Sequence, residues 1–90
     1  MAKRGRLEIL KDTLRIIKEN RNMIKPTVLL RKSKMSSSRF KEYYNELIQG
    51  GFVNEVHNKH DERFIELTQK GYRFLERYKS IMEFIDEFEL

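Results

Sequence analysis

Gly50 and Gly51 mark the point at which the apolar residues of this chain change their spacing. Before them, apolar residues recur every three or four positions, which is the period of an amphipathic helix. After them, two short runs rich in aromatic and β-branched residues, FVNEVH and ERFIEL, have the pattern of strands. The chain is therefore expected to begin with helices and continue as a β-hairpin, with one glycine in the left-handed conformation that ends a helix.

The first helix is predicted over residues 6–20. One apolar stripe follows its period, and we expect it to be buried: Leu7, Leu10, Leu14 and Ile17. Ile9 and Ile16 lie off that stripe and form a second apolar row. That row is available either to the core or to another subunit.

Two further helices are predicted before the glycines. Pro26 is expected to open a short second helix, where its missing N–H costs nothing, and this helix should end near Ser33 or Lys34. Ser36 offers a hydroxyl N-cap for the third helix. The third helix is expected to turn four residues inward: Phe40, Tyr44, Leu47 and Ile48.

A hairpin and a last helix complete the predicted chain. Turn-forming residues at positions 58–61 separate the two strands, and Thr68 should cap a helix that runs from Gln69 to the C-terminus. The expected fold class is mainly α with a small β-hairpin (α+β). Three helices, two strands and a closing helix follow one another in the order of a winged helix-turn-helix.

Length and composition limit what the chain can be. Its 90 residues suffice for one domain, and the absence of cysteine excludes a disulfide framework, a thiol nucleophile and a thiolate zinc site. No apolar run is long enough to cross a bilayer or resembles a signal peptide. We therefore expect a soluble cytoplasmic protein without a membrane partner.

The basic residues are concentrated in the first half of the chain. Residues 1–49 contain 13 Lys and Arg against 5 Asp and Glu, whereas residues 50–90 contain 6 against 9. Clustered cations favour a polyanion as the partner, because neutralising its phosphates releases condensed counterions. The same charges are also typical of solvated helix faces, and that alternative stays open.

The third helix is expected to present a polar face to a nucleic acid. Opposite its apolar side lie five polar or charged residues: Ser37, Ser38, Lys41, Glu42 and Asn45. Ser, Lys and Asn hydrogen-bond base edges or phosphates, and small serines let a helix N-terminus approach closely. Further contacts are predicted around the start of the helix: Arg31, Lys32, Lys34, Ser36 and Arg39. The alternative is that the serines form only an N-cap and a solvated first turn.

The hairpin is expected to act as the wing, with Lys59, His60 and Arg63 beside phosphates or the minor groove. A metal site at His57 and His60 is not expected, because no distant ligand accompanies them. The sequence contains no Gly-rich phosphate loop, nucleophile elbow or separated carboxylate pair in an evident cleft. We therefore predict no enzyme activity, no cofactor and no small-molecule ligand.

The closing helix is longer than a domain of this size needs. We divide the chain into a DNA-binding domain, residues 1–79, and a helical extension, residues 80–90, because the apolar stripe continues beyond the part that covers the core. Dimer contacts are predicted along this stripe and the second row of the first helix: Ile9, Ile16, Tyr78, Ile81, Met82, Ile85 and Phe88. The alternative is a tail that folds back on its own domain.

Two longer patterns, KMSSSRFKEYYNELIQGGFV and FIELTQKGYRFLERYK, together with GRLEILKDTLRIIK, resemble the small archaeal winged helix-turn-helix proteins. These include dimeric crenarchaeal chromatin-associated proteins and regulators encoded by archaeal viruses. The resemblance implies a homodimer that binds double-stranded DNA in the cytoplasm, nucleoid-associated or in the host of a virus, with the third helix in the major groove. Winged helices also serve as protein-interaction adaptors, and that alternative remains. RNA binding is less favoured, because no stacking aromatics are predicted on the exposed face.

Overall fold

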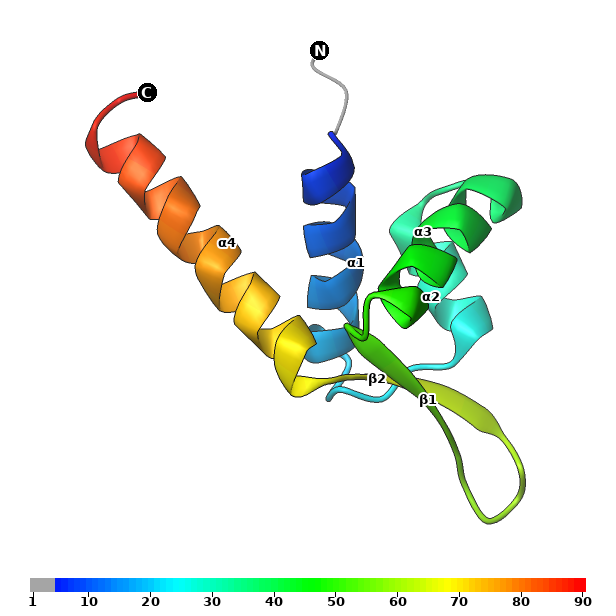
Figure 1. Ribbon diagram of the computed structural model, residues 1–90. Coiled ribbons are helices and arrows are strands. Elements are labelled where there is room, and N and C mark those ends of the chain that lie inside the picture. The colour runs from blue at the N-terminus through cyan, green and yellow to red at the C-terminus, as the bar shows by residue number, and fades with distance from the viewer. Residues whose placement is uncertain (1–4) are drawn as a thin grey trace.

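The computed structural model describes residues 5–90; residues 1–4 of the predicted first domain lie outside the described residues. Within residues 5–90 the predicted order of elements is confirmed, with four helices and a two-stranded antiparallel hairpin. Their bounds are α1 (Arg6–Glu19), α2 (Pro26–Ser33), α3 (Ser37–Gln49), β1 (Val53–His57), β2 (Arg63–Leu67) and α4 (Gln69–Glu87). Figure 1 shows the hairpin projecting at one end of the molecule and α4 diverging from α1.

The predicted helix ends are confirmed by their hydrogen bonds and dihedral angles. Pro26 is the first residue of α2. The backbone N–H of Arg39 donates to the Ser36 hydroxyl at 3.3 Å, which caps α3. At the start of α4, the N–H of Gly71 donates to the Thr68 hydroxyl at 3.1 Å. Gly51 takes the left-handed conformation, with φ of 76°.

The hairpin has a regular antiparallel register from Val53 opposite Leu67 to His57 opposite Arg63. Its turn is organised by Asn58, whose side-chain oxygen accepts from the backbone N–H groups of His60 and Glu62, each at 2.9 Å. An asparagine that satisfies two loop donors in this way fixes the shape of a turn that the strands alone leave open.

A third extended segment joins the hairpin, which the sequence analysis did not predict. Ile24 and Ile65 exchange backbone hydrogen bonds of 3.2 and 2.8 Å, and the N–H of Leu67 donates to the Asn22 side chain at 2.6 Å. The loop between α1 and α2 is therefore attached to β2. This attachment holds the helices against the hairpin, and Ile24 itself is buried.

The buried face of α1 differs from the predicted stripe. Leu7 is 55% exposed, whereas Ile9 is 2% exposed. Thr13 is also buried, and its hydroxyl donates to the Ile9 carbonyl at 2.8 Å. The prediction that Ile9 contacts a second subunit is therefore wrong, because its side chain is already covered within one chain. The spacing of apolar residues along α1 does not reveal which face of the helix packs against the rest of the protein. In the structure, that face carries Ile9 and Thr13.

One compact core joins all the elements. Its buried members come from both strands and every helix before them: Leu10, Leu14, Ile17, Ile24, Leu29, Phe40, Leu47, Val53, Ile65 and Leu67. The start of α4 packs against this core through Tyr72, Phe74 and Leu75. Gly71 is buried there, and the position requires a glycine because a Cβ would clash with the Phe52 carbonyl oxygen.

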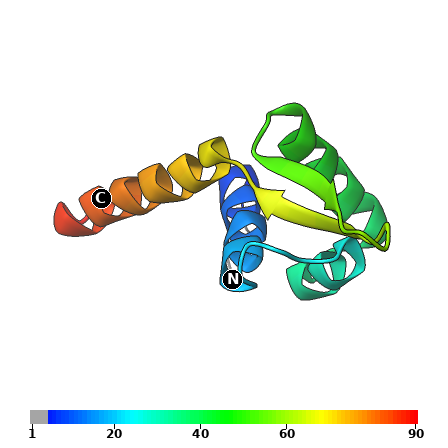
Figure 2. The ribbon, with the colours of Figure 1, turned by 90° about the horizontal axis from the view of Figure 1, so that it is seen from below.

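Beyond this contact, α4 leaves the body of the molecule. Seen from below, it extends to one side while α2 and α3 lie on the other (Figure 2). The molecule therefore measures 50 Å along its longest axis but 27 and 21 Å across. None of the helices in residues 5–90 combines the length and apolarity that a bilayer span requires.

Candidate nucleic-acid interface

The exposed side of α3 is polar over its whole length. The five residues predicted for its outer face are all exposed: Ser37, Ser38, Lys41, Glu42 and Asn45. Phe40 and Leu47 are buried on the inner side of the same helix. Because the inner side is held by the core, the helix keeps a fixed orientation and its outer face can be presented to a flat or grooved partner.

The N-terminus of α3 is suited to an anion. The Ser36 and Ser38 hydroxyls lie 3.5 Å apart, and no acidic residue occupies the first turn. The Arg39 guanidinium lies 5.9 Å from the centre of the Tyr43 ring, so it remains at the rim of this turn. Free backbone N–H groups at a helix start, beside small hydroxyls and a cation, favour phosphate oxygens.

The cations of α2 divide between two surroundings. Arg31 and Lys34 are exposed, and Lys34 takes a left-handed conformation in the short turn that leads to α3. The Lys32 ammonium instead donates to the Asn20 side chain at 2.9 Å, at the end of α1. Of the predicted cations, Lys34 therefore lies directly before α3, whereas the Lys32 ammonium is bound at the end of α1.

The predicted basic residues of the wing lie at two places, in the turn and at the start of β2. Lys59 and His60 are exposed at the turn. Arg63 lies at the other end of the loop, where its guanidinium is 3.8 Å from a Glu55 carboxylate oxygen. Its charge is thus partly balanced before any partner approaches.

Glu55 also connects the wing to α3, through a contact that the sequence analysis missed. The Tyr44 hydroxyl donates a hydrogen bond to the Glu55 carboxylate. Burial first, and then the hydrogen bond to Glu55, raise the pKa of Tyr44 well above its ordinary value. Tyr44 was predicted to point into the core; it packs there by its ring, which stacks on Phe40, while its hydroxyl reaches the strand. We call Tyr44, Glu55 and Arg63 the helix–wing latch.

A second set of polar contacts fixes the wing turn. Glu62 accepts from the Asn58 amide at 3.0 Å and forms an ion pair of 3.0 Å with Lys25. These two contacts lower the pKa of Glu62. The wing is thereby attached to the residue that precedes α2 as well as to α3.

No group of three or more His, Asp or Glu side chains among residues 5–90 is arranged to hold a metal ion. What the described surface offers is a polar helix face, a serine-capped helix start and a wing with exposed cations. Among the five residues predicted for the outer face of α3, Glu42 is the only one that carries a negative charge. This arrangement suits a phosphate-bearing partner better than a small ligand.

Comparison with known proteins places this arrangement in a wider group. The sequence model for the winged helix-turn-helix matches residues 3–86. The crystal structure of Sso10a-2, a DNA-binding protein from Sulfolobus solfataricus, aligns with a TM-score of 0.75 at 20% identity, over 96% of this chain and 86% of that one. No curated protein sequence matches the chain significantly.

Two other solved structures share the fold. The F-93 protein of SSV1, an archaeal virus, has a TM-score of 0.63 at 25% identity, over 88% of this chain and 91% of F-93. A MarR mutant from E. coli, solved with operator DNA, has a TM-score of 0.65 at 20% identity, over 76% of this chain and 49% of MarR. The predicted resemblance to archaeal winged helix-turn-helix proteins is thus confirmed at the level of family and fold.

Proposed function

Because the chain belongs to the winged helix-turn-helix family, we propose that it is a dimeric transcription regulator that binds double-stranded DNA. In this proposal α3 enters the major groove and the 57–63 wing contacts the adjacent backbone or minor groove. The fold is a DNA-binding one, and its neighbours include proteins named as transcription regulators. The cytoplasm, where such DNA lies, is the corresponding proposed location.

The observation that carries the proposal is the outer face of α3. Ser38, Lys41 and Asn45 are exposed on one side of a helix whose other side is locked in the core. The helix backbone that carries these side chains is already ordered before binding, which favours recognition of base edges. The capped N-terminus with Arg39 beside it supports phosphate contacts at the same end.

The wing supplies the second contact in the proposal. Lys59 and His60 project at the turn, and the helix–wing latch fixes the angle between the wing and α3. On binding, the Arg63 guanidinium would pair with a phosphate, either in place of Glu55 or in addition to it. A fixed angle matters because two contacts help affinity only when both can be made at once.

Homodimer formation is proposed through the second half of α4. Ile81, Met82 and Phe88 are exposed, Ile85 and Tyr78 are half-buried, and Ile16 is half-buried on α1. Contiguous exposed apolar side chains on a helix are unfavourable in water and mark an interaction surface. We retain residues 80–90 as a dimerisation extension on this ground.

The test is a titration of labelled duplex DNA, followed by fluorescence anisotropy, at about 50 and 200 mM salt. A protein with six or more phosphate contacts is expected to lose about 10³-fold in affinity over this range. A matched control is Glu76→Gln, on the exposed side of α4 away from α3, which should bind as the wild type does. Absence of binding at low salt would remove the proposal and favour a protein-interaction adaptor.

A second experiment separates a regulator from an architectural protein. Selection from a random duplex pool should enrich a palindrome whose half-sites are about one helical turn apart, since a two-fold dimer presents two copies of α3. Binding without enrichment would indicate an architectural role and would contradict sequence-specific regulation.

A further inference from the structure

An acidic side chain lies in the middle of the exposed face of α3. Ser38, Glu42 and Asn45 follow one another at spacings of four and three, so they lie in one row along the helix. All three are exposed, and their row is opposite Phe40 and Leu47, which are buried. Any partner that covers the outer face of α3 must therefore meet the Glu42 carboxylate.

The Glu42 carboxylate is available to such a partner. In the part of the chain that the structure describes, it forms no ion pair and no hydrogen bond. The Arg39 guanidinium, three residues earlier and within reach of such a pair on a helix, lies instead 5.9 Å from the centre of the Tyr43 ring. Glu46, the other acid of α3, is ion-paired with Arg6.

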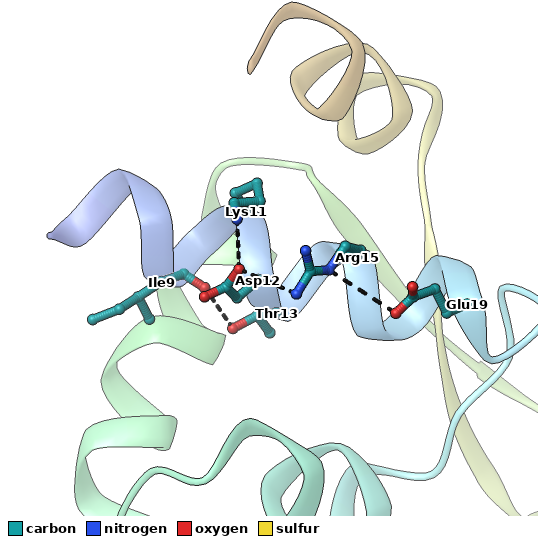
Figure 3. A network of polar contacts seen from close by, with 6 residues as sticks. All are labelled: Ile9, Lys11, Asp12, Thr13, Arg15 and Glu19. Carbon is teal, nitrogen blue, oxygen red and sulfur yellow. Dashed lines mark hydrogen bonds and ion pairs between the residues drawn. The ribbon is translucent and has the colours of Figure 1, made fainter. Parts of the chain in front are cut away.

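Two acids of α1 provide a contrast. Figure 3 shows Asp12 between Lys11 and Arg15, at 2.7 and 3.6 Å. Glu19 lies 4.0 Å from Arg15 in the same view. These acids are balanced by cations of their own helix, whereas Glu42 has cations close to it in the chain and remains unpaired.

A DNA duplex offers few groups that can donate to this carboxylate. Phosphates repel it, and the donors that base edges present in the major groove are the amino groups of cytosine and adenine. The adenine amino group lies beside the N7 acceptor, which also repels a carboxylate, whereas the cytosine amino group lies beside a C–H group. Cytosine is therefore the better match. The guanine paired with it presents two acceptors, which suit the Lys41 ammonium next to Glu42.

We propose that Glu42 is a specificity-determining residue of α3, which selects a cytosine by accepting a hydrogen bond from its amino group in the major groove. This assignment rests on the proposed DNA binding and specifies one C·G base pair in each half-site. Where another base stands at that position, the carboxylate loses its hydration without gaining a donor, and binding is weakened. Glu42 thus acts mainly by penalising wrong sequences.

The deciding experiment compares the wild type with Glu42→Gln in the full chain. Each protein selects sequences from a random duplex pool, and duplexes with each base pair at the C·G position are then titrated. The wild type should bind the cytosine duplex about tenfold more tightly than the others. Glutamine has the same shape but pairs with N6 and N7 of adenine, so Glu42→Gln should change the preferred base from cytosine to adenine. Because Glu42 is exposed and unpaired, thermal unfolding should stay at the wild-type temperature.

The matched control is Glu76→Gln, which removes the same charge from an exposed position of α4 and should keep the preference for cytosine. If Glu42→Gln raised the affinity for all sequences equally, with every base preference unchanged, Glu42 would act through its charge alone. That result, or a change at a position where the wild type prefers another base, would overturn the assignment and leave the proposed DNA binding standing. A wild type that enriches no sequence would also overturn it, and absence of DNA binding at low salt would overturn both proposals.

Discussion

Helix α3 and the second half of α4 both expose side chains, but of opposite character. The exposed face of α3 is made of hydroxyl, ammonium, carboxylate and amide groups, whereas α4 exposes Ile81, Phe84 and Phe88. Polar side chains are well solvated by water, so the exposed surface of α3 is stable in a single chain. Large apolar groups are stabilised by burial, at about 25 cal/mol per Å² removed from water. The two regions therefore differ in what stabilises them: the face of α3 is stable in contact with water, whereas the end of α4 is stabilised by an apolar partner surface.

The largest expected effect comes from making α4 resemble α3 in polarity. Ile81→Asp with Ile85→Asp should abolish dimerisation, with a weakening of at least about 100-fold, because two charges would enter an apolar contact. Sedimentation velocity at micromolar concentration measures it. Asn54→Asp with Gln69→Asp adds the same charge at exposed polar positions outside residues 80–90 and should leave the dimer intact. Unchanged sedimentation of the isoleucine variant would show that this end of α4 is not the contact.

The converse change acts on α3 alone. Ser38→Ala with Lys41→Ala and Asn45→Ala should weaken DNA binding about 10- to 100-fold, since base and phosphate contacts are each worth about 1–3 kcal/mol. Thermal unfolding and sedimentation should match the wild type, because these side chains are exposed and lie far from α4. Equal DNA affinity in the triple variant would remove α3 as the reading surface. Loss of the dimer would contradict the separation of the two regions.

A third change tests the start of α4, where this helix packs against the core. Gly71→Ala adds a methyl group against the Phe52 carbonyl oxygen and should destabilise the fold by about 1–3 kcal/mol through overpacking. Urea unfolding followed by circular dichroism measures the loss. Gly5→Ala is the matched control, since a Cβ there meets nothing within 4 Å. An unchanged midpoint for Gly71→Ala would show that the start of α4 is held less tightly than its burial indicates.

The smallest effect is expected in the helix–wing latch. Tyr44→Phe removes the hydroxyl that donates to Glu55 and should cost about 1 kcal/mol of stability, with a loss of DNA affinity of a few fold. The raised pKa of Tyr44 means that its contribution is fully present below the ordinary pKa of tyrosine, about 10, and is lost as pH rises through the higher folded value. Alkaline difference spectra of wild type and Tyr44→Phe check this. A phenolate signal from Tyr44 at about pH 10 would contradict the latch.

Local patterns predicted most of the fold because each element has its own signal in the chain. Pro26 and Ser36 set helix starts, Gly51 ends α3, and Thr68 caps α4, all through contacts within a few residues. The outer face of α3 could be predicted for the same reason, since a helical period fixes which side chains oppose Phe40 and Leu47.

The errors and omissions concern contacts between residues far apart in sequence. Spacing favoured Leu7 over Ile9 for the core, and the structure reverses them because α1 packs through the face of Ile9 and Thr13. The Ile24–Ile65 bridge and the Tyr44–Glu55 hydrogen bond leave no local pattern. No periodicity in one segment encodes the orientation of a distant one.

The sequence by itself determined the six elements, the caps of α3 and α4 and the polar outer face of α3, because these depend on neighbours along the chain. Only the tertiary structure decided which face of α1 is buried, how the wing is tied to α3, and that Arg6 of α1 pairs with Glu46 of α3. The physical reason is that packing and ion pairing act between surfaces brought together by folding. Their energies depend on relative orientation, which local backbone preferences leave free.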